Sequence, residues 1–394
     1  MTASSSAMST YSEAQFVACN IYISSASSTN STLQNLLKAA QDHCRSIREK
    51  GSASTEFNDG GIGNENQGGR CWHKEKSTVA VIHAFADVPY KRSSFHLAGH
   101  SDCVADVALN LILNSFDQID VDSEAQGANA HPSVGLVDHV SVMPMVTYPV
   151  EESNSVMLGD ICEKGLHPSQ LAAADAARAI GSSINERGLV NVHYYGLACP
   201  NRKSLAKVRK EKTAFFNSDS TSPNSDASKK GDCTIGAPFH FVENYNIRMS
   251  TNVGLAQAKT LTQFVRGRNI ASRGYGIEGV EALTLPYQMC SASGEENLVY
   301  EVACNLTNPR KGSVNDIEEA VDKWIGQQTP PSAIDDVTRY FVHKKYRVGT
   351  TEKQCIDTLM NGCSNNDTLN SQYWSDHDDG VLDRFQQYLT GQQA

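Results

Sequence analysis

The sequence predicts an α/β fold in which helices cover the outer faces of layered sheets. Three observations favour this class. Strand patterns alternate with amphipathic-helix patterns along most of the 394 residues. Hydrophobic residues make up 40% of the chain, which is enough for a sizeable core. A stretch at 214–235, rich in Ser, Asp, Asn and Lys, separates two such alternating regions, and we interpret it as a linker between subdomains.

The first region starts with two strand-and-helix pairs. The apolar run at 16–23 (FVACNIYI) is typical of a buried strand. The helix after it has one apolar face, formed by Leu33, Leu36, Leu37, Ala40 and Cys44. Turn-forming residues at 51–77 predict a surface insertion. A second strand is expected at 78–85, and Ser101 is placed to cap the helix that follows it.

The rest of the first region is predicted as a strand, a helix, a strand and a basic helix, at 135–145, 168–187, 189–195 and 201–213. Pro168 suits the first turn of its helix, where its missing N–H would be unpaired in any case. Strict alternation along the strand that begins at Gly135 would put His139 on one face of the sheet and Asp138 on the other.

The second region repeats this organisation with fewer elements. We expect a strand near 239–249, a helix at 254–267 and a hairpin of strands 277–290 and 297–305. Ser313 opens another helix, and Thr351 with Gln354 fits a capping box that opens a last one. Residues 1–15 are expected to be a flexible N-terminus, and residues 361–394 a polar tail.

Composition excludes several classes of function. The formal net charge of −10 argues against a nucleic-acid partner, because phosphate neutralisation needs clustered Lys and Arg. No run approaches the ~20 apolar residues that span a bilayer, so no membrane partner is expected. The N-terminus lacks the apolar core of a secretory signal, and the 11 scattered cysteines include no C-x-x-C pair. These features predict reduced thiols and a cytoplasmic location.

The densest polar cluster surrounds His131. Pro132 directs His131 away from helical geometry, so this imidazole should lie in the loop before a strand and can face a cleft. Imidazole titrates near neutral pH and can therefore move a proton. The alternative is a hydrogen-bonded structural histidine. A zinc pair of His131 and His139 has no third ligand at convincing spacing, so we expect no metal.

A second cluster follows directly on the strand at 78–85. It includes Asp87, Tyr90, Lys91 and Arg92. Ligand-binding loops gather at strand ends in α/β proteins, and an arginine can hold a carboxylate through two parallel hydrogen bonds. The alternative is a charged turn without a ligand.

Five segments resemble the formiminotransferase domain family. HPSVGLVDHVSVMP resembles the signature H-P-R-[LM]-G-[AV]-[VL]-D, and FADVPYKRSSFHLAG resembles F-E-D-x-x-Y-x-R of the plant-type, single-function branch. The other matches, in chain order, are HYYGLA with the basic helix after it, NYNIRMSTNVGLAQAKTL and LVYEVACNLTNP. Together the five segments extend over roughly residues 16–360.

The resemblance implies two α/β sandwich subdomains with helices on their outer faces and a ligand groove between them. They would comprise residues 16–213 and 236–360. The implied reaction moves a formimino group between N5 of tetrahydrofolate and L-glutamate, as part of one-carbon metabolism and histidine degradation. Tetrahydrofolate is then a substrate, folate and glutamate are the partners, and a homodimer is a candidate assembly.

The resemblance also assigns residues. His131 inherits the role of catalytic acid and base. The residues expected to bind substrate or folate are Asp87, Tyr90, Arg92, His139 and Asn246.

Departures from the family pattern favour a second hypothesis. Ser133 replaces the arginine of the signature, and the 214–235 stretch lacks the Gly/Phe/Pro pattern of the animal enzymes. The alternative function is a non-catalytic protein that binds a reduced folate such as 5-formyltetrahydrofolate. The 85 residues after Pro309 are too few for a helical cyclodeaminase domain, so that activity is not expected.

Overall fold

The computed structural model describes residues 15–25, 31–55, 77–87, 89–119, 132–145, 166–213, 230–290, 296–328 and 336–361. Several predictions fall outside these ranges. They concern His131, the N-terminus up to residue 14, nearly all of the 51–77 insertion, the linker up to residue 229 and the tail from residue 362.

The first part of the chain builds a six-stranded sheet with the order β2-β3-β1-β4-β6-β5. The strands are β1 (Phe16–Ile23), β2 (Val79–Asp87), β3 (Arg92–His100), β4 (Val137–Pro144), β5 (Asn191–Gly196) and β6 (Asp232–Ala237). The first four in this order pair antiparallel, whereas β4 with β6 and β6 with β5 pair parallel. The predicted strands at 16–23, 78–85, 135–145 and 189–195 are all confirmed within a few residues.

Three helices cover one face of this sheet: α2 (Ser31–Thr55), α3 (Ser101–Gln118) and α6 (Pro168–Glu186). The five predicted apolar residues of α2 are all at most 1% exposed, so that face is confirmed. The residue that caps α3 was predicted wrongly. Its N-cap is His100, and Ser101 lies inside the helix, because the chain leaves β3 without an intervening loop. The basic helix α7 (Leu205–Lys212) is capped by Ser204, whose hydroxyl accepts from the Lys207 N–H.

The second part builds a four-stranded antiparallel sheet with the order β10-β7-β9-β8. Its strands are β7 (Glu243–Met249), β8 (Val280–Cys290), β9 (Glu296–Leu306) and β10 (Val342–Val348). Its helical elements are α8 (Leu255–Val265), η2 (Gly267–Asn269), α9 (Ile270–Arg273), α10 (Val314–Ile325) and α11 (Val337–Phe341). Ser313 and Asp316 form a reciprocal capping box at the start of α10, and Gly326 caps its end.

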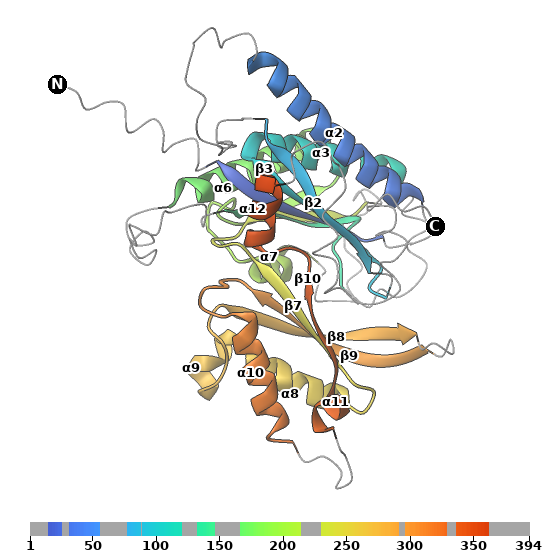
Figure 1. Ribbon diagram of the computed structural model, residues 1–394, viewed down its shortest axis with the longest axis vertical. Coiled ribbons are helices and arrows are strands. Elements are labelled where there is room, and N and C mark those ends of the chain that lie inside the picture. Colours follow the sequence, from blue (N-terminus) through green and yellow to red (C-terminus); the bar gives the residue numbers. More distant parts are fainter. Residues whose placement is uncertain are drawn as a thin grey trace, which may run out of the picture.

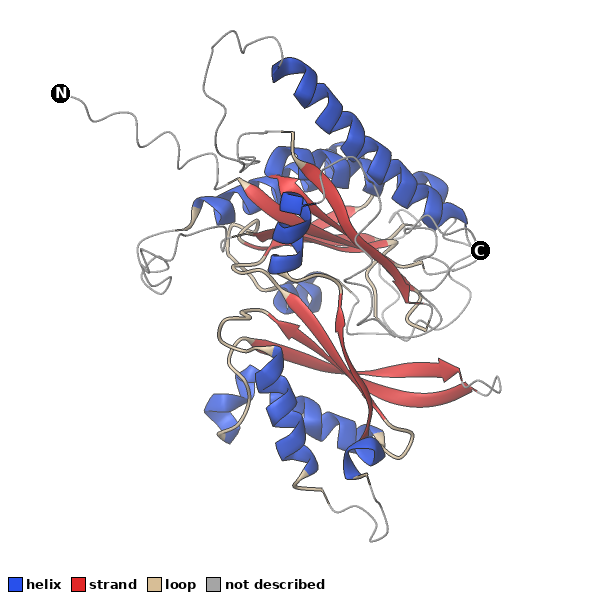
Figure 2. Cartoon of the chain, viewed as in Figure 1, coloured by secondary structure: helices blue, strands red, loops and turns tan. Residues whose placement is uncertain are grey.

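The two sheets lie between two layers of helices. Figure 1 shows α2, α3 and α6 on one side of the molecule and α8 and α10 on the opposite side. Figure 2 shows the same arrangement by element type, with the strands in the middle. A separate apolar core lies between each sheet and its helices. Successive side chains of a strand point to opposite faces of the sheet, and in each sheet the apolar ones point towards the helices. The predicted class, two α/β sandwiches with helices outside, is confirmed.

Two elements cross the predicted subdomain limits. β6 begins at Asp232, inside the stretch expected to be a linker, and it is an inner strand of the larger sheet. The last helix, α12 (Glu352–Asn361), follows β10 but packs on the larger sheet. Its Cys355 and Leu359 are buried in a small apolar cluster with Phe16, Ile82, Ala98, Met143, Met145 and Phe241. Both departures depend on contacts between distant segments, which local sequence patterns do not encode.

Candidate functional site

The face of the larger sheet opposite α2, α3 and α6 has an apolar part, covered by α12, and a polar part. Cross-strand partners share a face, so the strand register puts one row of side chains across it: Ser94, Tyr22, His139, Thr234 and His193. The next row is His96, Asn20, Ser141, Gly236 and Tyr195. Most of these side chains are buried, and their imidazole, hydroxyl and amide groups can make hydrogen bonds and exchange protons.

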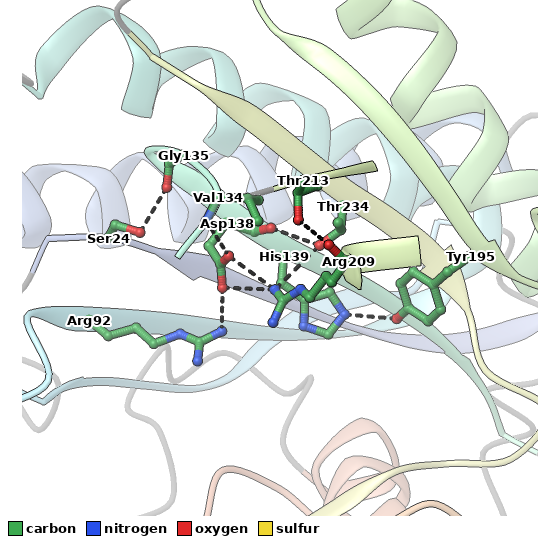
Figure 3. Close-up of polar contacts among 10 residues, drawn as sticks. All are labelled: Ser24, Arg92, Val134, Gly135, Asp138, His139, Tyr195, Arg209, Thr213 and Thr234. Atoms are coloured by element: carbon green, nitrogen blue, oxygen red, sulfur yellow. Dashed lines mark hydrogen bonds and ion pairs between the residues drawn. The ribbon is translucent and has the colours of Figure 1, made fainter. Parts of the chain in front are cut away.

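Asp138 is the hub at one end of this face. Its carboxylate is buried between two guanidinium groups (Figure 3). Arg92 Nη2 lies 2.8 Å from Oδ2, and Arg209 Nη2 lies 3.0 Å from both carboxylate oxygens. Two arginines thus contact one buried carboxylate in a chain whose net charge is −10. The carboxylate limits the cost of burying the arginines, and guanidinium groups are well suited to binding anionic ligands.

A bulge brings Asp138 and His139 to the same face, and the strict alternation expected for this strand is wrong here. The register between β1 and β4 shifts at Tyr22/Ile23, where Tyr22 pairs with His139 and Ile23 with Val137. Asp138 is therefore the extra residue, and a bulge of this kind redirects a side chain. Its partner Arg92 stacks over the Tyr22 ring at 4.2 Å, and that ring is itself stacked on His139 with 5.5 Å between centroids. His139 Nε2 also shares a 2.9 Å hydrogen bond with the Tyr195 hydroxyl.

The segment just after His131 is held from several sides. The Val134 N–H donates to Asp138 Oδ1 at 3.0 Å, and the Ser24 hydroxyl donates to the Gly135 carbonyl at 2.8 Å. The Asp232 N–H donates to the Val134 carbonyl at 2.9 Å. A Cβ on Gly135 would lie 2.2 Å from the Asp232 carbonyl oxygen, so only glycine permits this approach. The segment from Val134 onwards is thus fixed beside Asp138. His131 itself lies outside the described residues.

A second hub, Glu301, lies on β9 of the smaller sheet and is fully buried. Its Oε1 accepts from the Tyr90 hydroxyl at 2.9 Å and from Asn246 Nδ2 at 2.7 Å. Its Oε2 accepts from the Tyr346 hydroxyl at 2.5 Å and from Arg248 Nε at 3.3 Å. Tyr90 comes from the larger sheet and the other three from the smaller one, so this carboxylate joins the two sheets.

Asp87 lies between the two hubs. Its Oδ1 accepts the Tyr90 N–H at 3.2 Å. Burial, followed by the nearby Glu301 carboxylate, raises the pKa of Asp87 to about 7, while the Tyr90 N–H, Arg248 and Arg92 act in the opposite direction. A carboxyl group that titrates near neutral pH is suited to proton transfer.

The structure brings the predicted site residues together in two groups. Asp87, Tyr90 and Asn246 gather around Glu301, whereas Arg92 and His139 meet through Tyr22 beside Asp138. Among the described residues, no three His, Cys, Asp or Glu side chains are grouped as a metal ion would require. No helix within those ranges is long and apolar enough to cross a membrane.

Several central residues were missed from the sequence: Tyr22, Asp138, Arg209, Arg248 and Glu301. All except Tyr22 fall within segments that carry the family resemblance. Those segments were therefore the signal in the sequence that could have identified these residues. Their roles depend on pairings across 46 to 211 positions of the chain, which one sequence does not reveal. In the sequence, Tyr22 belongs to a mostly apolar strand pattern. Only the register between β1 and β4 shows that its neighbours are polar.

Comparison with known proteins agrees with this architecture. The family model described as "Formiminotransferase domain, N-terminal subdomain" matches residues 70–238, so the predicted resemblance is confirmed. A curated protein of Arabidopsis thaliana, "Formiminotransferase cyclodeaminase-like protein", is 22% identical over 311 residues, which cover 73% of this chain and 88% of the relative. At the level of the family, the matches support a folate-related transferase.

Solved structures add nothing to this assignment. The periplasmic protease PqqL from Escherichia coli matches with 12% identity and a TM-score of 0.17, over 96% of this chain and 40% of that one. The ferredoxin protease FusC, in complex with Arabidopsis ferredoxin, matches with 10% identity and a TM-score of 0.14, over 96% and 39%. The chain thus covers about two fifths of each protease, and such low TM-scores carry no argument.

Proposed function

We propose that this chain, which carries the N-terminal subdomain of the formiminotransferase domain over residues 70–238, moves a formimino group between N5 of tetrahydrofolate and L-glutamate. The observation that carries the proposal is the Asp138 hub. It accepts the N–H of Val134, three residues after His131, and is bonded to two arginines. A proton-transfer group and a local positive charge are the two requirements of this reaction.

His131 is the proposed acid and base. Glutamate arrives as an ammonium ion, and its nitrogen can attack the amidine carbon only after losing a proton. The tetrahedral intermediate then expels N5, which must gain a proton. One imidazole near neutral pH can perform both transfers, and such catalysis typically contributes ~10²–10⁴-fold in rate.

The other residues are proposed to bind and orient the two substrates. Arg92, held at the Asp138 hub, provides positive charge for a carboxylate of glutamate or folate. His139, stacked on Tyr22 and hydrogen-bonded through Nε2 to the Tyr195 hydroxyl, is proposed to orient the ligand on the polar face. Asp87 and Asn246 lie where the two sheets meet, beside Glu301. The homodimer and the cytoplasmic location stay predictions.

The decisive experiment incubates the purified protein with 5-formiminotetrahydrofolate and glutamate and measures the tetrahydrofolate formed. We expect turnover by the wild type and a loss of ~10²–10⁴-fold in His131→Ala, with folate binding retained. The matched control is His43→Ala, because His43 lies on α2 and pairs there with Asp106 of α3, on the far side of the sheet. Unchanged turnover in His131→Ala would show that another group transfers the proton.

A non-catalytic folate-binding protein is the second candidate. Ser133 favours it, because the family signature has an arginine at this position and the chain lacks that cation beside His131. A wild-type protein that binds 5-formyltetrahydrofolate but forms no product from the formimino substrate would establish this function in place of the transferase.

A further inference from the structure

The turn at residues 89–91, which leads into Arg92 of β3, connects the two hubs. Asp87 and Arg92 are cross-strand partners at the last pair of the β2–β3 ladder. Between them, Lys91 adopts φ = 48°, a left-handed conformation that few residues other than glycine occupy. Such a conformation persists only where the surroundings enforce it. The contacts of the residues on either side of Lys91 show what enforces it here.

Tyr90 extends from this turn to the smaller sheet. The residue is 6% exposed, and its hydroxyl donates to Glu301 Oε1 at 2.9 Å. Its ring meets the Tyr287 ring edge-on, with 5.2 Å between centroids. It also packs in an apolar cluster with Leu285, Tyr287 and Val299, all of which belong to the smaller sheet. Tyr90 is therefore fixed by the smaller sheet although its backbone belongs to the larger one.

Arg92, two residues later, is held by the larger sheet. It is bonded to Asp138, and the other oxygen of that carboxylate accepts the Val134 N–H. A continuous series of contacts thus runs from Glu301 through Tyr90, the strained Lys91 and Arg92 to Asp138. It ends at the backbone of the segment that follows His131.

We propose that the turn at residues 89–91, together with Arg92, mechanically couples the two sheets, and that Tyr90 is a positioning residue rather than a ligand contact. Its bond to Glu301 determines where Arg92 meets Asp138, and through Asp138 how firmly the Val134 segment is held. A shift of the smaller sheet is then transmitted to the proposed reaction face. Only the consequence for folate affinity rests on the proposed function.

The test compares two tyrosines that donate to the same carboxylate. Tyr90→Phe removes the hydroxyl that crosses between the sheets and keeps the ring against Tyr287. Tyr346→Phe is the matched control, because its hydroxyl also donates to Glu301 but comes from β10 of the same sheet as Glu301. The reporter is hydrogen exchange in peptides that contain the Val134 amide, whose N–H is bonded to Asp138.

We expect exchange at Val134 to become about three- to tenfold faster in Tyr90→Phe, the change that one lost hydrogen bond produces. Tyr346→Phe should leave it at the wild-type rate. Equal rates in all three proteins, or the same acceleration in both variants, would overturn the coupling. This readout needs no ligand.

A second arm measures binding of 5-formyltetrahydrofolate by calorimetry. The coupling predicts weaker binding in Tyr90→Phe and wild-type binding in Tyr346→Phe. Equal affinities in all three would show that the turn does not affect the ligand and would refute the coupling at the proposed site. If the wild type binds no reduced folate, the proposed function fails, and the exchange rates alone decide whether the turn couples the sheets.

Discussion

Asp138 illustrates how a single residue gives the polar face its charge and its rigidity. Its buried carboxylate is shared by two arginines rather than paired with one. The same carboxylate also accepts the Val134 N–H. One side chain therefore holds both the two arginines and the backbone that follows the proposed base. Such a hub is costly to bury unless all its hydrogen bonds are made. This requirement explains the bulge that turns Asp138 towards the arginines.

Asp87 gives the protein a pH dependence near neutrality. Its pKa is raised to about 7 in the folded protein, mainly by burial, whereas an unfolded aspartate titrates near ~4. Between these values the folded state binds a proton that the unfolded chain has lost. The free energy of unfolding should therefore fall as the pH rises from about 4 through 7. Asp87→Asn, which has no proton to lose, should remove this part of the slope and gain stability relative to the wild type at pH 8.

Urea denaturation at pH 5 and pH 8 measures the effect. The difference between Asp87→Asn and the wild type should be more favourable at pH 8 than at pH 5. Asp175→Asn provides the control, because the Asp175 side chain is 73% exposed and its ion-pair partner is an arginine, Arg178, so the substitution should give similar differences at both pH values. Parallel pH profiles for Asp87→Asn and the wild type would show that another group controls the slope.

Among the elements, those with local signals were predictable from the sequence. The β8–β9 hairpin, α2 with its apolar face and the capped start of α10 all follow from periodicity, turn residues or capping residues, and the structure confirms them. β3 was missed because RSSFHLAGH places polar side chains on the face opposite the helices. β6 was missed because a six-residue strand inserted between β4 and β5 is specified by its neighbours rather than by its own pattern.

The residues of the candidate site also divide into those that the sequence predicts and those that it does not. The polar cluster at the end of β2 was visible because charged residues directly follow a buried strand. The two hubs, Asp138 and Glu301, were not visible, because their hydrogen-bond partners come from distant segments that meet only in the folded chain. Arg209 shows the difference clearly. On sequence it belongs to a basic, solvated helix, yet its side chain is 7% exposed and bonded to Asp138, 71 positions away.

The loop that enters β4 depends on a close backbone approach, which gives a prediction at the scale of an element. Gly135 forms an isolated bridge with Gly231, and a Cβ there would meet backbone atoms of Asp232 and Lys230 at 2.2 and 2.6 Å. Because backbone cannot move aside as a side chain can, Gly135→Ala should cost about 1–3 kcal/mol of unfolding free energy or more. Chemical denaturation of the purified variant measures this loss.

Gly326→Ala is the matched control for that substitution. Gly326 caps α10 with φ = −61°, and a Cβ there would meet its nearest atoms at 3.6 Å, an ordinary contact. Alanine should therefore stabilise the protein by about 0.4–1 kcal/mol, because it restricts the unfolded chain more than glycine does. Two variants of the same chemistry should thus change stability in opposite directions. Equal effects would mean that the approach of Gly135 to Asp232 is not tight.

At the scale of the whole molecule, the contacts that join the two sandwiches include at least three within the described residues. Tyr90 bonds to Glu301 between the sheets, His96 Nδ1 shares a 3.1 Å hydrogen bond with the Thr350 hydroxyl, and α12 returns from the smaller sheet to pack on the larger one. All three lie on the inner faces rather than on the helical layers. The proposed site therefore depends on both halves of the chain, and neither half alone contains both hubs.

Charge on the scale of the whole molecule opposes the proposed ligands, since folate and glutamate are anions and the chain carries −10. Binding must then depend on local positive charge, for which we propose the two arginines that share Asp138. Arg92→Ala should weaken reduced-folate or glutamate binding by about 1.5–3 kcal/mol, the range for a hydrogen bond to a charged group. This corresponds to roughly 10- to 150-fold in Kd. The fold should persist, because Arg209 still neutralises Asp138.

Titrations at two ionic strengths test this dependence on local charge. Wild-type affinity should fall only modestly with salt, because a partly buried charge is screened less than an exposed one. Arg187→Ala is the control, since Arg187 is exposed at the end of α6 on the helical layer and contacts the Ser183 carbonyl there. That variant should bind as the wild type does at both ionic strengths. If Arg92→Ala also binds as the wild type does, with its circular dichroism unchanged, then Arg92 only stabilises the turn and the ligand charge is met elsewhere on the molecule.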